Sequence, residues 1–417
     1  MTSPTGPIRR REVLLVLSSV MVTVLMGMSI MVPVLPLYAQ SFGVTSALVG
    51  AVIAAFGLAR IFMDIPAGHW SERYGRRPFI IAGPAVFTVA SLLCGLATDF
   101  WLLLLFRFLQ GLGSALYTTA AMSVLSDIST REDRGRIMSI YQGTLLFGTG
   151  IGPVVGGLVA QGYGIRAPFY FSAALGLAAT LWALWRIPET RQTMHPADPL
   201  PHGRIPAQEG AREGLRTLLL NPNFLLVGLI AFSMHFTHTG ARQTIVPLLG
   251  YNQLGLSEAQ IGFAVTVISF IDLFVIYFGG LVADRFGRKL AIVPSSVIGA
   301  ASLVLFALGQ DYAFFLFSAV VFGISRGIAG PAPMAFAADI ASKGSYGLAS
   351  GLYRTLADIG LMLGPVALGW IADAADFQSA LYFNAGLLVV AALLFGALAR
   401  ETVRGPEPEP VLAEADG

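Results

Sequence analysis

Long apolar stretches alternate with short polar segments along almost the whole chain. Twelve of these stretches are about 20 residues long, the length that a helix needs to cross the hydrocarbon core of a bilayer. We therefore expect an all-α integral membrane protein with twelve transmembrane helices. The expected spans are 13–38, 46–68, 78–97, 100–125, 137–160, 167–187, 224–249, 258–280, 290–309, 312–337, 349–372 and 379–399.

The polar segments repeat at a fixed offset of 212 residues, because Gly68–Arg77 returns as Gly280–Lys289. The same offset relates Tyr141 to Tyr353, Gly152-Pro153 to Gly364-Pro365, and Glu189-Thr190 to Glu401-Thr402. Two copies of one membrane unit in parallel order predict two six-helix bundles. This is the architecture of a secondary transporter whose substrate site lies between the halves.

The spans and the repeat divide the chain into five parts. They are a cytoplasmic N-terminus (1–12), an N-terminal bundle (13–187), a linker (188–222), a C-terminal bundle (223–400) and a cytoplasmic tail (401–417). The linker is rich in proline, glycine and charge, which predicts a flexible connection with a short surface helix around 209–219. The tail is acidic and rich in proline, so we expect it to be disordered.

Composition and charge agree with a multi-pass membrane protein. The chain is 55% hydrophobic and 12% charged, whereas soluble domains carry about 25% charged residues. Nearly all loop Arg and Lys residues fall on the side of the N-terminus, with Arg166 as the exception. The positive-inside rule then places both termini in the cytoplasm and the protein in the cytoplasmic (inner) membrane. The single Cys94 excludes a disulfide framework or a Cys-based metal cluster, and we expect no metal site.

The repeated loop combines glycines with a cluster of charges. A first glycine in each copy (Gly68, Gly280) lets a neighbouring helix come close. A second glycine (Gly75, Gly287) permits a tight cytoplasmic turn. The charged positions are Glu72, Arg73, Arg76 and Arg77 in the first copy and Asp284, Arg285, Arg288 and Lys289 in the second.

Asp127 and Asp339, at the cytoplasmic ends of the fourth and tenth spans, are the natural partners of these arginines. Such pairs would latch an outward-facing state, and breaking them would release an inward-facing one. Alternatively, the arginines only set the topology.

Three further segments and the repeated loop carry a family resemblance. The repeated loop resembles motif A of the major facilitator superfamily, and Gly27–Pro36 resembles the first-span signature of its twelve-span drug:proton antiporters. Arg107–Gly113 resembles motif B, and Gly148–Gly157 resembles the antiporter motif C. The motif C positions are Gly148, Gly152, Pro153, Gly156 and Gly157. The resemblance implies the major facilitator fold and proton-driven export, and it implies a role for Arg107 in proton coupling.

Ionisable residues inside a span are costly, so they are candidates for coupling. We take Asp64 and Asp272 as the only carboxylates well inside the expected spans. Each is either a proton carrier or half of a structural ion pair. Arg60 lies one turn from Asp64, and the repeat places it opposite Asp272, so two pairings of Arg60 are open.

Polar faces on the fourth and seventh spans are expected to line a central cavity. They carry Arg107, Gln110 and Tyr117 on the fourth span, and His235, His238 and Arg242 on the seventh. Further cavity candidates are Met28, Met31, Arg326 and Tyr353. The histidines serve either in coupling or as hydrogen-bonded cavity residues. The arginines indicate a cavity that tolerates anionic or zwitterionic substrates, although Asp272 and Asp358 neutralise part of their charge.

The leading hypothesis is an antiporter that exports small hydrophobic organic compounds or drugs. The alternatives are an uptake or facilitated-diffusion carrier for a sugar, organic acid or other metabolite, and a receptor or scaffold. The chain lacks a P-loop and a nucleophile–base motif, so we expect neither an ATP-driven pump nor an enzyme. The expected partners are a small molecule, protons and lipid, with no nucleic acid, no cofactor besides the ion gradient, and a monomer as the working unit. Sodium in place of protons stays open.

Overall fold

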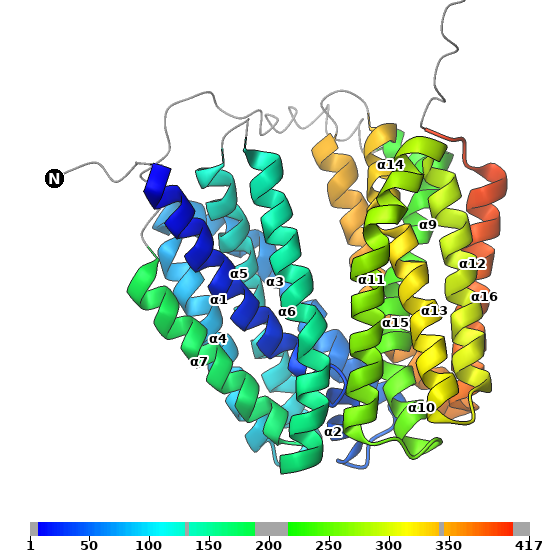
Figure 1. The fold of residues 1–417 in the computed structure, drawn as a ribbon, viewed down its shortest axis with the longest axis horizontal. Coiled ribbons are helices and arrows are strands. Elements are labelled where there is room, and N and C mark those ends of the chain that lie inside the picture. The colour runs from blue at the N-terminus through cyan, green and yellow to red at the C-terminus, as the bar shows by residue number, and fades with distance from the viewer. Residues whose placement is uncertain (1–6, 130–132, 188–215, 342–345, 403–417) are drawn as a thin grey trace, which may run out of the picture.

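The computed structural model describes residues 7–129, 133–187, 216–341 and 346–402. Within these ranges the chain is helical and contains no β-strand. Twelve spans are long and apolar enough to cross a membrane, which confirms the predicted number. Figure 1 shows them as two bundles that lie side by side. The expected linker helix falls largely outside the described residues, and the tail beyond Thr402 falls wholly outside them.

The N-terminal bundle consists of α1 (Pro7–Ile30), α2 (Leu35–Gln40), α3 (Ser46–Tyr74), α4 (Arg77–Leu96), α5 (Phe100–Ile128), α6 (Arg134–Tyr163) and α7 (Ala167–Arg186). The C-terminal bundle consists of α9 (Pro222–Phe236), η2 (Thr237–Ile245), α10 (Val246–Asn252), α11 (Glu258–Phe286), α12 (Arg288–Leu308), α13 (Tyr312–Ala329), α14 (Ala332–Ile340), α15 (Tyr346–Ala374) and α16 (Phe377–Leu398).

Three expected spans are interrupted. The first divides into α1 and α2, where Pro33 and Pro36 remove backbone donors. The tenth divides into α13 and α14 at Gly330, whose φ of +41° is a conformation that favours glycine. The seventh contains the π-helix η2 between α9 and α10. Such irregular backbone is tolerated at membrane depth where protein surrounds it.

The two bundles pack through α3 against α15 and through α6 against α11. The closest approaches occur at equivalent places in the repeat. A methyl group added at Gly50 would overlap the carbonyl of Pro365, and one at Gly262 would overlap the carbonyl of Pro153. These glycines therefore let the backbones of the two halves touch.

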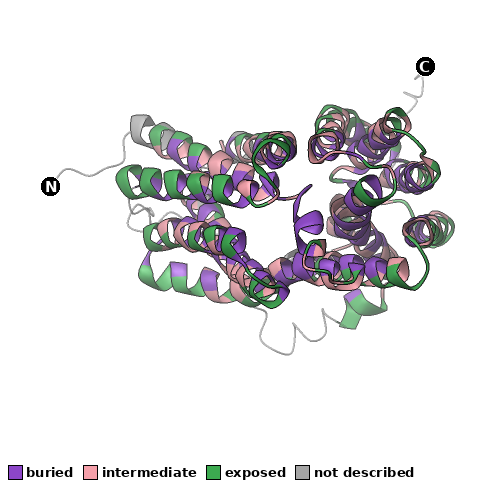
Figure 2. Ribbon diagram, turned by 90° about the horizontal axis from the view of Figure 1, so that it is seen from below, coloured by how far each residue is buried: buried purple, intermediate pink, exposed green. Residues whose placement is uncertain are grey.

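All of these contacts lie toward the end of the molecule that is remote from the N-terminus, which we call the closed end. There Asn252 donates to Gln40 at 3.0 Å across the halves, and the largest buried apolar cluster contains residues of both bundles. The bundles diverge toward the opposite end (Figure 1). Seen from the closed end, buried residues gather toward the middle of the molecule and exposed ones around its rim (Figure 2).

Candidate functional site

The motif A segments are mostly helical rather than looped, because α3 continues to Tyr74 and α11 to Phe286. Each helix ends at a glycine with positive φ, +101° at Gly75 and +106° at Gly287, so these positions form the expected turns. The expected role of the first glycine is wrong for Gly280, since no atom lies within 4 Å of a side chain added there.

In the first copy, Arg76 is buried and reaches Asp127 on α5. Its Nε lies 3.2 Å from the Asp127 carboxylate, and its Nη1 donates to Ser71 Oγ at 3.0 Å. Arg77 donates to the carbonyl of Leu184 on α7 at 3.1 Å. Glu72 is exposed. These contacts of the first copy join α3, α4, α5 and α7 of one bundle.

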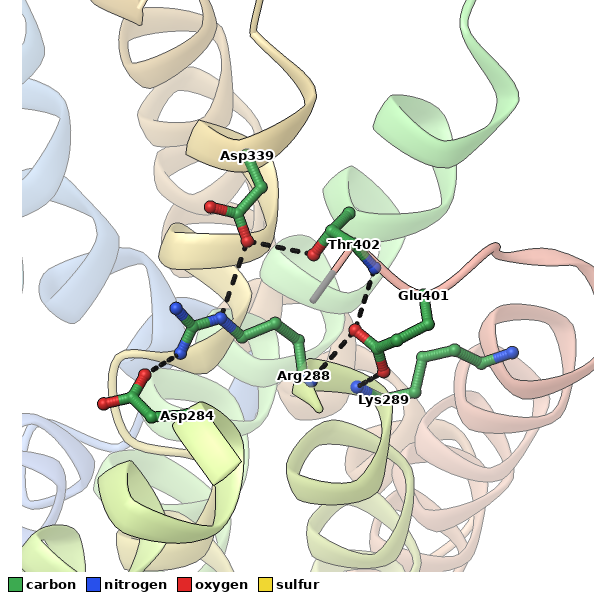
Figure 3. Close-up of polar contacts among 6 residues, drawn as sticks. All are labelled: Asp284, Arg288, Lys289, Asp339, Glu401 and Thr402. Atoms are coloured by element: carbon green, nitrogen blue, oxygen red, sulfur yellow. Dashed lines mark hydrogen bonds and ion pairs between the residues drawn. The ribbon is translucent and has the colours of Figure 1, made fainter. Parts of the chain in front are cut away.

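The second copy makes an equivalent cluster (Figure 3). The guanidinium of Arg288 pairs with Asp284 on α11 and lies 3.6 Å from Asp339 on α14. Glu401 accepts hydrogen bonds from the backbone N–H groups of Arg288 at 3.1 Å and Lys289 at 3.0 Å. These amides begin α12, so the carboxylate caps the helix where its dipole favours negative charge.

Thr402 completes the second cluster by donating to Asp339 at 2.9 Å. The signal for this cap was present in the sequence, because Glu401-Thr402 repeats Glu189-Thr190, yet spacing alone did not say what the pair binds. In this conformation each cluster connects helices within its own bundle. The expected partners are found, because Arg76 pairs with Asp127 and Arg288 with Asp339, whereas the role of these pairs as a latch of an outward-facing state stays a prediction.

The motif C glycines of α6 face two neighbours. Methyl groups at Gly152 and Gly156 would overlap Ser29 and the carbonyl of Ile30, so these positions pack against α1. Pro153 disrupts the helical hydrogen-bond ladder, and the next amide, that of Val154, donates to Thr266 Oγ1 on α11 at 2.9 Å. The motif therefore packs α6 within its own bundle and bonds it to the other bundle.

A polar network surrounds Arg107 on α5. Its Nη1 donates to Gln110 Oε1 at 2.5 Å, and Gln110 donates to Ser91 Oγ at 2.6 Å and to Met31 Sδ at 3.4 Å. The guanidinium also lies 4.8 Å from the ring centre of Phe56 on α3. No carboxylate lies within ion-pair distance of it in the part of the chain that the structure describes.

Other cavity candidates lie in or beside the apolar packing. Tyr117 is buried in the apolar core of the N-terminal bundle and Tyr353 in that of the C-terminal bundle. Met31 is buried where the bundles meet, and Met28 is partly buried beside it. Ser114 contacts Met28 Sδ at 3.8 Å.

The π-helix η2 changes which residues of the seventh span share a face. Its wider turn brings residues five positions apart together, and Gln243 Nε2 lies 3.2 Å from His238 Nε2. His235 belongs to α9, and its Nδ1 donates to the carbonyl of Ala231 at 2.9 Å. The expected polar face of His235, His238 and Arg242 is therefore divided between α9 and η2, and its place in a central cavity stays a prediction.

Arg326 on α13 links η2 to α11. Its Nε lies 3.2 Å from the Asp272 carboxylate, and its Nη1 lies 3.0 Å from His238 Nδ1. Arginine only donates, so His238 Nδ1 accepts and the imidazole is neutral in this arrangement. Arg242 donates to Ser269 Oγ on α11 at 2.6 Å. A connected polar network thus lies in the middle of the C-terminal bundle.

The structure contradicts both pairings considered for Arg60. Asp272 pairs with Arg326, and Asp64 accepts from Thr119 at 3.3 Å. Neither carboxylate lies within ion-pair distance of Arg60 among the described residues. Asp358 also lies well inside α15, so Asp64 and Asp272 are not the only intramembrane carboxylates. The charges of Arg60, Asp64 and Arg354 all act on Asp358.

Comparison with known proteins agrees with this architecture. The family model of the major facilitator superfamily matches residues 17–238 and 231–415, which is most of the chain. This chain belongs to the major facilitator superfamily. It is therefore a multi-pass membrane transporter.

Relatives in this superfamily match over most of their length. Multidrug resistance protein 2 of Bacillus subtilis is 25% identical, and the match covers 87% of this chain and 89% of that protein. Quinolone resistance protein NorA of Staphylococcus aureus is 25% identical over 87% of this chain and 90% of that protein. The fold matches a bacterial homolog of the human lysosomal transporter Spinster, inward-facing and unoccupied, with a TM-score of 0.81. That match has 18% identity and covers 94% of this chain and 97% of the other.

Proposed function

We propose that this transporter is a proton-coupled exporter of small hydrophobic organic compounds that works by alternating access. Its curated relatives include a multidrug and a quinolone resistance protein, similar over nearly the whole chain. It works as a monomer in the cytoplasmic membrane, with both termini in the cytoplasm and no cofactor besides the proton gradient. With that orientation, the closed end faces outward and the conformation described here is inward-facing. The Arg76–Asp127 and Arg288–Asp339 pairs are formed in it, so in this proposal they are not restricted to the outward-facing state.

The observation that carries the proposal is the Arg326–Asp272 ion pair inside the membrane-spanning part of the C-terminal bundle. Coupling requires a group whose proton affinity changes as the transporter changes conformation. A carboxylate that loses its arginine partner in a low-dielectric site binds a proton more readily, and one that keeps it stays ionised. Asp272 meets this requirement because it lies on α11, which packs against α6 of the other half, so movement of the halves that shifts α11 relative to α13 changes its contact with Arg326.

The packing of motif C is consistent with the proposed exchange of substrate for protons. The Val154–Thr266 hydrogen bond and the Pro153–Gly262 contact seal α6 against α11 at the closed end. A tight seal at that end keeps protons from leaking through while the other end is open. Asp64 is the competing proton carrier, because it also lies within a span and accepts only a long hydrogen bond from Thr119.

The test is proton movement in everted membrane vesicles energised with an acidic lumen. Adding an exported compound to the wild type is expected to release protons from the lumen. Asp272→Asn is expected to abolish the release, and Asp64→Asn to leave it. Loss in Asp64→Asn alone would move the coupling site to α3. An absence of proton release with every compound, despite normal expression, would contradict the exporter and favour a metabolite carrier.

A further inference from the structure

The charges inside the spans are unevenly balanced. The ionisable Arg and Asp side chains well inside the described spans are Arg60, Arg107, Arg242, Arg326, Arg354, Asp64, Asp272 and Asp358. Arg60, Arg354, Asp64 and Asp358 form one group whose charges act on each other and cancel. Asp272 alone remains to balance Arg107, Arg242 and Arg326. The deep part of the transporter therefore carries an excess of positive charge.

Within the C-terminal bundle, Arg326 forms the ion pair with Asp272. It contacts both Asp272 and the neutral imidazole of His238, so its guanidinium is well satisfied. The charge of Asp272 acts on Arg242, but the two side chains form no ion pair among the described residues. Its one side-chain hydrogen bond goes to Ser269, and its Nε is buried with no hydrogen-bond partner in the described structure.

Arg242 lies beside the boundary between the halves. Its partner Ser269 is on α11, and a methyl group added at Gly150 of α6 would lie 3.9 Å from the Ser269 Cβ. That spacing is an ordinary van der Waals contact between α6 and α11. The motif C segment of one bundle thus lies against the helix that carries the hydrogen-bond partner of Arg242, at the boundary between the halves, which is where the substrate of such a carrier binds.

Burying a guanidinium in a low-dielectric site costs free energy when it has no counter-charge and when one of its N–H groups makes no hydrogen bond. The cost is removed when a carboxylate accepts two parallel N–H bonds from the planar guanidinium. We propose that the exported compounds are hydrophobic molecules that carry an acidic group, and that Arg242 binds this group beside Ser269. This inference rests on the proposed exporter function and specifies its substrate class.

The π-helix is what makes this site possible. An α-helical seventh span would turn Arg242 and Gln243 to different positions relative to His238, whereas in η2 the Gln243 side chain lies 3.2 Å from His238 Nε2 and Arg242 donates to Ser269. Arg326 already donates its Nη1 to His238 and pairs with Asp272, so Arg242 is the arginine of the network in the C-terminal bundle that is left for a ligand. His238 therefore acts as a positioning residue for the site.

The test compares N-dansyl-leucine with N-dansyl-leucinamide, which share an apolar body and differ in the carboxylate. Binding to the purified full-length protein in lipid nanodiscs is followed by dansyl fluorescence. We expect the carboxylate to bind at least about tenfold more tightly than the amide, as for one charge-assisted bidentate contact. Arg242→Gln is expected to remove this preference, and Arg242→Lys to restore only part of it.

The matched control is Arg354→Gln, which removes the same charge from a span but from the balanced group near Asp358, and is expected to keep the preference. Asp272→Asn should raise the affinity for the carboxylate, because it removes the one competing negative charge. Equal or tighter binding of the amide, or a preference that survives Arg242→Gln, would overturn the inference.

Failure of this inference is distinguishable from failure of the exporter. Proton release evoked only by cationic or neutral compounds in the vesicle assay, with no carboxylate preference, refutes the acidic substrate class and leaves the exporter standing. Carboxylate binding that depends on Arg242, without any proton release, supports the anion site and refutes proton-coupled export.

Discussion

A carboxylate at the closed end holds the two bundles together. Asp373, in the last turn of α15, accepts hydrogen bonds from the backbone N–H groups of Ser46 at 2.7 Å and Ala47 at 2.8 Å. These amides begin α3 of the other bundle. The contact therefore places a negative charge at a helix N-terminus, where the dipole favours it. When the closed end opens, Asp373 is left at the C-terminal end of its own helix, where the dipole disfavours it.

Asp373→Asn removes the charge and keeps one acceptor oxygen. A hydrogen bond to a charged group contributes about 1.5–3 kcal/mol when buried. Because Asp373 is exposed, we reduce the expected loss to about 1 kcal/mol, in the range measured for charges at exposed helix ends. The ratio of closed to open molecules at this end should then fall about fivefold. Asp373→Ala removes both acceptors and should have a larger effect.

Asp376→Asn is the matched control. Asp376 lies three residues further along and is also exposed, but it accepts from Ser379 N at 2.6 Å within its own bundle. That hydrogen bond lowers the pKa of the Asp376 carboxyl, so the control also removes an ionised group. Loss of the Asp376 charge should weaken the cap at the N-terminus of α16 without changing the ratio of closed to open molecules.

The assay measures distances between spin labels at Gln40→Cys and Asn252→Cys, which lie on opposite bundles at the closed end. The native Cys94 is buried, so labelling is confined to the introduced cysteines. The reasoning is refuted if Asp373→Asn leaves the distance distribution unchanged, or if Asp376→Asn shifts it as much.

Three further predictions concern contacts between or within the bundles. Thr266→Val should lower the closed-to-open ratio up to about fivefold, because it removes the acceptor of a hydrogen bond that contributes about 1 kcal/mol. Thr266→Ser keeps the hydroxyl group and should leave the ratio unchanged in the same distance measurement. Gly262→Ala should prevent the closed end from closing, because the new methyl overlaps the Pro153 carbonyl, whereas Gly386→Ala meets no atom within 4 Å and should leave the distances unchanged. Glu401→Gln should destabilise the protein by about 1 kcal/mol through the weakened cap of α12, read as a lower thermal midpoint; an unchanged midpoint would show that the cap is not needed.

Several features of the site were not predictable from the sequence. The pairing of Asp272 with Arg326 joins residues 54 positions apart on separate spans, and nothing local prefers it over Arg60. The repeat was misleading there, because it aligns Asp272 with Arg60 although the two halves pair their charges differently. The π-helix was likewise hidden, because no residue pattern in the seventh span marks it; in the structure η2 packs against α15.

The sequence by itself determined the twelve spans, the two-bundle repeat and the family. A bilayer admits only long apolar helices whose backbone groups are satisfied within each helix, so composition along the chain is sufficient to find them. The turn glycines Gly75 and Gly287 were readable for the same local reason. The tertiary structure alone decided which charges pair, which arginines lack an ion-pair partner and which end is closed. Those outcomes depend on contacts between distant helices and on conformational differences of a few kcal/mol, which no single segment encodes.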